Sequence, residues 1–234
     1  MKLPPTPHPF RLRGLLALLC LALLPVIGKA QESASVRLSF GAVGLLDNLA
    51  TLHLAAGADA DGQPTEWLQV RLNQHTISQP IDYSGPLQLR FFGTESTAEP
   101  PVAATTVDGT AESLLLVFVP DDNNRYRIVQ VNDDRFAFGS YYFHNLSPHP
   151  VALEVGDHRS ALRPGEQTIV RAAVAASQLV RIYSRIDDQQ RLIRSSTWRL
   201  EPGQRELIFF HTPTGTNLVQ ARHLISARPD DPDD

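Results

Sequence analysis

The chain has 234 residues, of which 42% are hydrophobic and 20% are charged, and its formal net charge is −4 at pH 7. Four of the 21 basic residues and none of the 25 acidic residues lie in the first 30 positions, so the remainder carries a net charge of −8. A negatively charged chain is poorly suited to bind nucleic acid or an anionic membrane surface, because both repel it.

Residues 1–30 have the composition of a secretory signal peptide. Two arginines precede an apolar run at residues 14–27, and small residues up to Ala30 provide a cleavage site. The run has about 14 residues, fewer than the roughly 20 that a membrane-spanning helix needs. We therefore expect a periplasmic or secreted protein with no membrane span after signal cleavage. An uncleaved N-terminal anchor is the alternative.

After residue 30 the sequence contains no cysteine, lysine or methionine. Disulfides are therefore excluded even in an oxidising compartment, and stability must come from burial. A mature chain of about 200 residues is long enough for one large domain or for two domains of about 100 residues each.

Short segments in which apolar and polar residues alternate predict strands with one buried face. These segments are residues 36–40, 49–55, 67–72, 87–92, 125–131, 151–155 and 167–171, with an aromatic segment at 140–145. Residues 114–119, LLLVFV, are apolar at every position, which predicts a central strand buried on both faces. Many short strands and scarcely any 3.6-residue period predict an all-β fold.

The two halves of the mature chain have similar segments in the same order. LRFFG at residues 89–93 resembles VRIYS at 180–184, and SLLLVFVP at 113–120 resembles ELIFFHTP at 206–213. We expect a tandem duplication that gives two β-sandwich (immunoglobulin-like) modules at residues 35–134 and 137–227, followed by an acidic disordered tail at 228–234. The alternative is that unrelated β segments share alternation and turns.

The second module contains an Asn-Leu-Ser-Pro turn that begins at Asn145 and a Pro-Gly turn that begins at Pro164. With these turns it resembles a family of exported bacterial β-sandwich domains of unknown function. The resemblance covers about 35 residues, and the first module lacks the Asn-Leu-Ser-Pro turn. It implies an extracytoplasmic sandwich domain without known catalytic residues.

Asp59, Asp61 and Glu66 lie in or beside a glycine-bearing loop and are the candidates for a calcium site, because oxygen ligands at alternate positions suit calcium. A complete EF-type loop requires acids where Gly57 and Leu68 stand, so a plain polar hairpin loop is the alternative. No cofactor is expected.

His144, Asp157, His158 and Ser160 are residue types that hydrolases use. Nucleophilic catalysis requires a serine on a strained turn beside a base, and no Gly-x-Ser-x-Gly motif is present. The sequence therefore favours a protein that is not an enzyme, with an unrecognised hydrolase as the alternative.

Several aromatic side chains are candidates for a ligand-binding platform, although core packing is their commoner role. The set contains Trp67, Tyr141, Tyr142, Phe143, Tyr183 and Trp198. Within it, Trp67, Tyr142 and Trp198, together with His144, are the candidate ligand-binding residues. We expect an interaction or scaffolding protein at the bacterial cell envelope, with an unknown protein or a polysaccharide as partner. A carbohydrate-binding module is the alternative.

Overall fold

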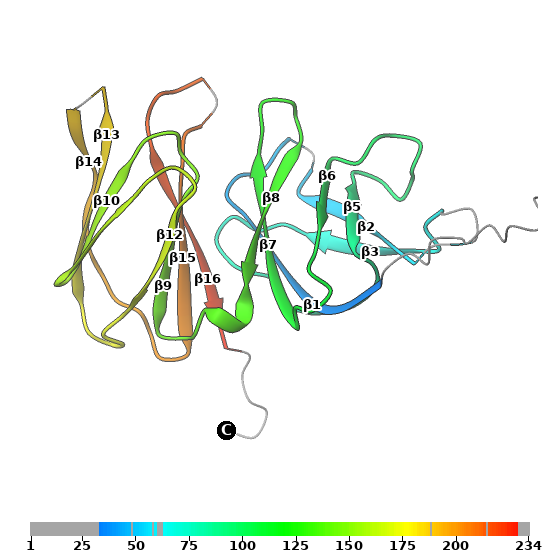
Figure 1. Cartoon of the computed structure of the whole chain (residues 1–234), viewed down its shortest axis with the longest axis horizontal. Coiled ribbons are helices and arrows are strands. Elements are labelled where there is room, and N and C mark those ends of the chain that lie inside the picture. The colour runs from blue at the N-terminus through cyan, green and yellow to red at the C-terminus, as the bar shows by residue number, and fades with distance from the viewer. Residues whose placement is uncertain are drawn as a thin grey trace, which may run out of the picture. The chain divides into compact units, whose positions relative to one another are not determined.

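The structure is a computed structural model that describes residues 33–47, 49–57, 59, 63–187, 189–213 and 215–228 (Figure 1). The predicted signal peptide, Asp61 and the tail beyond Arg228 lie outside these residues. The strands of the first half are β1 (Ser33–Ala42), β2 (Thr51–Ala56), β3 (Glu66–Arg71), β4 (Ile81–Pro86), β5 (Gln88–Phe92), β6 (Ala103–Thr106), β7 (Ser113–Pro120) and β8 (Tyr126–Asn132). Those of the second half are β9 (Ser140–Asn145), β10 (Val151–Val155), β11 (His158–Leu162), β12 (Gln167–Arg171), β13 (Gln178–Ile186), β14 (Gln189–Trp198), β15 (Gln204–His211) and β16 (Gln220–Ala227). No helix among the described residues is long and apolar enough to cross a bilayer.

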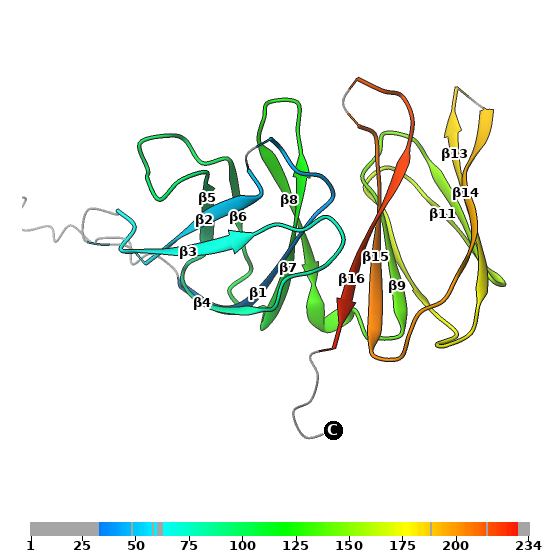
Figure 2. The ribbon, with the colours of Figure 1, turned by 180° about the vertical axis from the view of Figure 1, so that it is seen from behind.

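Each half forms a two-layer sandwich, which confirms the predicted all-β fold with two modules (Figure 1 and Figure 2). The first module consists of the sheets β4-β1-β7-β8 and β3-β2-β5-β6, and the second consists of β12-β9-β15-β16 and β11-β10-β13-β14. When the strands are numbered from the start of each module, the two orders are identical. A tandem duplication predicts this identity of strand order.

The strand order differs from that of an immunoglobulin constant domain. In both modules the first and seventh strands pair in parallel at the centre of one sheet. An immunoglobulin constant domain places its first, second, fifth and fourth strands in one sheet and its third, sixth and seventh in the other. The term immunoglobulin-like therefore describes the layers of this fold and not its connections.

The two sheets of each module bury the alternating apolar side chains that the sequence predicts. In the second module, Phe143 and Ile208 from one sheet share a core with Leu153 and Ile182 from the other. Because successive side chains of a strand point to opposite faces, burial of one set leaves the other set on the outer face of each sheet. The outer face of β11-β10-β13-β14 carries the candidate site described below.

Strand β7 is buried on both faces, as its continuous apolar sequence predicts. Leu114 and Leu116 point into the core of the first module. Leu115 and Val117 belong to a third core, in which they pack with residues of the second module such as Phe209. The sheets that contain β7 and β15 therefore bury side chains on both of their faces.

The repeat register that the sequence indicates for β7 and β15 is wrong by one residue. A separation of 93 residues makes Leu114 equivalent to Leu207. Leu114, however, lies in the core of the first module, whereas Leu207 lies in the third core. A shift of one residue moves every side chain of a strand to the opposite face. Equivalent residues of β7 and β15 must therefore be separated by an even number of residues. The separation of 91 residues between Phe91 and Ile182 is consistent, because both residues are core residues of their modules.

Candidate functional site

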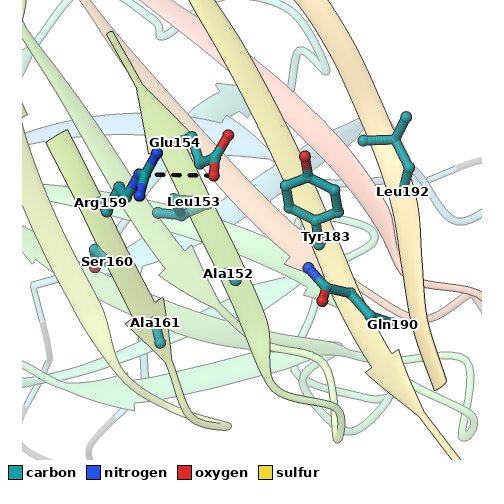
Figure 3. A pocket seen from close by; sticks show the side chains of 9 residues that line it. All are labelled: Ala152, Leu153, Glu154, Arg159, Ser160, Ala161, Tyr183, Gln190 and Leu192. Atoms are coloured by element: carbon teal, nitrogen blue, oxygen red, sulfur yellow. Dashed lines mark ion pairs between the residues drawn. The ribbon is translucent and has the colours of Figure 1, made fainter. Parts of the chain in front are cut away.

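The candidate site is a groove on the outer face of the sheet β11-β10-β13-β14 (Figure 3). It has a volume of about 710 Å³ and is lined by residues of all four strands. We call it the Tyr183 groove. Its lining consists of Ala152, Leu153, Glu154, Arg159, Ser160, Ala161, Tyr183, Gln190 and Leu192.

One row of side chains crosses the four strands at the centre of the Tyr183 groove. Ala161 pairs with Ala152, Ala152 pairs with Tyr183, and Tyr183 pairs with Leu192. The two alanines are short and leave space above the sheet on one side of the tyrosine. Leu192, which is 57% exposed, stands on the other side. The half-buried Tyr183 ring is therefore accessible from the groove (Figure 3).

Charged side chains lie on both sides of this row. A carboxylate oxygen of Glu154 is 3.7 Å from Nε of Arg159, and the other is 3.4 Å from a terminal nitrogen of Arg181. Beyond Tyr183, a second hollow of about 220 Å³ continues the groove and is lined by Arg185. Three arginines and one glutamate thus surround the tyrosine, so the groove is locally positive in a chain whose net charge is negative.

The first module covers the equivalent face with one of its own side chains. Phe91 and Ile182 are equivalent core residues of the two modules. The residues that follow them, Phe92 and Tyr183, are therefore also equivalent. Trp67 packs edge-on against Phe92 with the ring centroids 5.4 Å apart, and Phe92 is only 3% exposed. In the second module, the charged residue Arg159 lies at the position that corresponds to Trp67. The outer face around Phe92 is therefore covered in the first module, whereas the equivalent face around Tyr183 is open in the second.

The structure does not bring the predicted ligand-binding residues Trp67, Tyr142, His144 and Trp198 to one surface. Tyr142 is 3% exposed and belongs to the third core, whereas Trp198 is 9% exposed and belongs to the core of the second module. The Trp198 ring stacks on Phe143, and its N–H donates to Ser196 Oγ at 2.7 Å. Both Tyr142 and Trp198 therefore have the packing role that aromatic residues commonly have.

His144 is partly buried beside Tyr142, whose hydroxyl lies 3.2 Å from Nδ1 of the histidine. Burial lowers the pKa of His144 and Arg127 lowers it further, while a hydrogen bond with the backbone of Gly165 opposes both effects. Burial also raises the pKa of the Tyr142 hydroxyl. These shifts follow from position in a core and do not need a catalytic role.

The hydrolase-type residues are not brought together. His144 lies on β9, in the sheet that packs against the third core. His158 and Ser160 lie on β11, at the edge of the other sheet. No serine–histidine hydrogen bond of the kind that activates a nucleophile links these residues in the described part of the chain.

Asp59, a predicted calcium ligand, takes part in a turn. Its Oδ1 accepts the backbone N–H of Gln63 at 2.8 Å, and its own N–H donates to the Gln63 carbonyl oxygen at 2.9 Å. Glu66 begins β3 and is exposed, and Asp61 lies outside the described residues. Among the described residues, no three histidine, cysteine, aspartate or glutamate side chains come close enough together to hold a metal ion.

Sequence reasoning includes Tyr183 among the aromatic residues but does not identify the groove around it. The signal is present in β13, where Val180 and Ile182 are core residues and Tyr183 must therefore point outward. The edge strands β11 and β14 of the same sheet are not predicted, because their sequences do not show a clear alternation.

No protein-family model matches the chain, and a search of curated proteins finds no sequence match.

Proposed function

We propose that the protein is a non-catalytic binding protein of the bacterial cell envelope and that the Tyr183 groove is its contact surface. The observation that carries the proposal is the difference between the modules. Trp67 covers Phe92 in the first module, whereas the equivalent Tyr183 remains accessible in the second. An accessible concave surface with an aromatic floor and convergent polar groups is the usual form of a binding site.

The composition of the sequence supports the envelope location. Residues 1–30 have the charge and hydropathy pattern of a secretory signal peptide, and the remainder contains no cysteine. The net charge of −8 after residue 30 disfavours nucleic acid as a partner. We therefore place the protein in the periplasm or outside the cell.

The chemistry of the groove supports binding without turnover. Among the described residues that line it, Glu154 is the one carboxylate, whereas glycoside hydrolysis generally needs two carboxyl groups across the scissile bond. Ser160 has no histidine paired across from it, because its cross-strand neighbour is Leu153. Nucleophilic catalysis requires such a base within hydrogen-bond distance.

Site-specific photo-crosslinking tests the proposal in living bacteria that carry the full chain. A photoreactive amino acid replaces Leu192, which lines the groove, or Leu218, which is 53% exposed elsewhere. We expect a discrete adduct from position 192 in the envelope fraction and none from position 218. Equal adducts from both positions, or recovery of the protein in the cytosol with its leader intact, would contradict the proposal.

A screen of the purified protein against ester, peptide and glycosidic substrates tests the claim that it is not an enzyme. We expect no turnover above background. Turnover that disappears on His158→Ala or Ser160→Ala substitution would show that the hydrolase alternative is correct.

A further inference from the structure

We infer that the ligand of the Tyr183 groove is an acidic oligosaccharide, that is, a short sugar chain that carries carboxylate groups. This inference rests on the proposed function and identifies the class of ligand. Four features of the groove support it: the aromatic ring, the polar groups around this ring, the local excess of arginine and the edge of the sheet.

The floor of the groove suits the apolar face of a sugar ring. Tyr183 lies between Ala152 and Leu192, and its ring lines both the groove and the adjacent hollow. An aromatic ring offers a flat apolar surface, and short neighbours such as Ala152 and Ala161 allow a ring-shaped ligand to approach it. A protein partner usually buries its hot-spot side chains in a deep apolar pocket, and the residues that line this groove do not form one.

Hydroxyl groups of a sugar would find donors and acceptors around this floor. Gln190 has an amide that both donates and accepts, and Glu154 accepts. Figure 3 shows these two side chains on strands that lie on either side of the tyrosine. The polar groups therefore approach a ligand from two sides, as recognition of a polyhydroxylated ring requires.

The arginines add a preference for negative charge. Glu154 forms ion pairs with Arg159 and Arg181, so one carboxylate of the protein is shared between two guanidinium groups. Arg185 lines the second hollow and adds a further positive charge. Guanidinium groups bind carboxylates in a bidentate geometry, so a sugar acid is a complementary ligand.

The β14 edge of this sheet disfavours an extended peptide that would add as a fifth strand. β14 is one of the two edge strands of the sheet, and it carries Arg191 and Arg194. A bulge interrupts its pairing with β13 between Ile182 and Tyr183. Charged side chains and bulges are the devices by which edge strands resist further pairing.

Isothermal titration calorimetry with the purified mature protein tests the inference. The probes are an oligogalacturonate and its fully methyl-esterified form, which keep the same sugar chain and differ in charge. We expect the acid form to bind and the neutral ester to bind about tenfold more weakly, as the loss of one charge-assisted contact implies. Affinity for the acid form should also fall as salt concentration rises.

Four variants complete the experiment. Tyr183→Ala should weaken binding of the acid form by about tenfold or more, whereas Tyr183→Phe, which keeps the ring, should retain it. Arg185→Gln should reduce the preference for the acid form over the ester. Arg171→Gln, on the edge strand β12 of the other sheet, is the matched charge control and should leave binding unchanged. Unchanged far-ultraviolet circular dichroism confirms that each variant is folded.

The outcomes separate this inference from the proposed function. Equal affinity for the two probes, no binding of either, or binding that Tyr183→Ala leaves intact would overturn the acidic oligosaccharide. If neither probe binds while crosslinking from position 192 captures a protein, the groove is a binding surface with a different class of ligand. If both experiments are negative, the proposed function is also wrong.

Discussion

The guanidinium group of Arg205 on β15 forms an ion pair with the carboxylate of Asp133, in the connection between the two modules. Asp133 begins the short 3-10 helix η2 (Asp133–Arg135), which follows β8. Arg205 is 7% exposed, and it also donates to the carbonyl oxygen of Phe136 at 2.6 Å. Its guanidinium carbon lies 5.1 Å from the centre of the Phe136 ring and 4.6 Å from that of Phe138. One residue of the second module thus fixes the connection that leads into it.

Substitution Arg205→Ala should therefore lower the free energy of unfolding by about 3–5 kcal/mol, because it leaves a carboxylate in a largely buried site without its partner. Urea denaturation of the purified protein measures the change. The matched control is Arg199→Ala, which breaks an exposed ion pair with Glu201 and should cost about 0–1 kcal/mol. Equal effects of the two substitutions would show that Arg205 does not have this structural role.

The Asn-Leu-Ser-Pro turn of the second module has a physical explanation in Asn145, which is fully buried. Its side-chain amide donates to the carbonyl oxygens of His149 at 2.8 Å and Leu162 at 3.1 Å. Its Oδ1 accepts the backbone N–H and the hydroxyl of Ser147 at 3.0 Å and 2.7 Å. Asparagine at this position therefore satisfies four polar groups of the turn and of β11.

Asn145→Ala should destabilise the protein strongly, because each buried group left without a partner costs about 1–3 kcal/mol. The measurement is again the free energy of unfolding in urea, with Asn123→Ala in the exposed turn after β7 as the control. A loss within about 0.5 kcal/mol of that control, which is the usual range for a surface substitution, would mean that the turn does not depend on its asparagine.

The pKa of His211 is lowered to about 4, first because burial opposes its positive charge and second because Arg222 repels it. Its Nε2 is buried without a hydrogen-bond partner in the described part of the chain. An unfolded histidine has a pKa of about 6.5. Between these two values the unfolded chain binds a proton that the folded chain does not, so stability should decrease as the pH falls from about 6.5 to about 4.

His211→Asn should make this decrease shallower, since it removes one group that binds a proton on unfolding. Thermal or urea unfolding of both proteins between pH 4 and pH 7 gives the two slopes, and their difference isolates the histidine from the carboxylates that titrate in the same range. Substitution of the exposed His158 by asparagine is the control for removal of a histidine from the surface. Identical slopes for His211→Asn and the parent protein would contradict the assignment.

The sequence predicts a strand well when burial of that strand leaves a clear pattern of apolar and polar residues. β7 is apolar throughout because it lies between two cores, and β10 alternates because one of its faces is wet. Among the strands that alternation does not predict, β4, β6, β11 and β14 are at sheet edges. An edge strand buries less and carries more polar residues, so its pattern is weak.

The same cause explains why sequence reasoning does not find the groove. Tyr183 lies on a central strand, and its outward direction can be predicted from Val180 and Ile182. The residues that give the groove its walls, including Arg159 and Leu192, lie on the edge strands β11 and β14. Their positions depend on long-range pairing, which local periodicity does not encode.

Methyl nuclear magnetic resonance can show whether the Tyr183 groove is the surface at which the protein binds its ligand. Ala152, Ala161 and Leu192 provide labelled methyl groups in the groove, and Ala55 provides one on the equivalent face of the first module. Titration with the oligogalacturonate should shift the methyl signals of Ala152, Ala161 and Leu192 and leave that of Ala55 unchanged. Shifts that concentrate at Ala55, or that are absent from the groove while the protein binds the sugar, would show that the Tyr183 groove is not the binding surface.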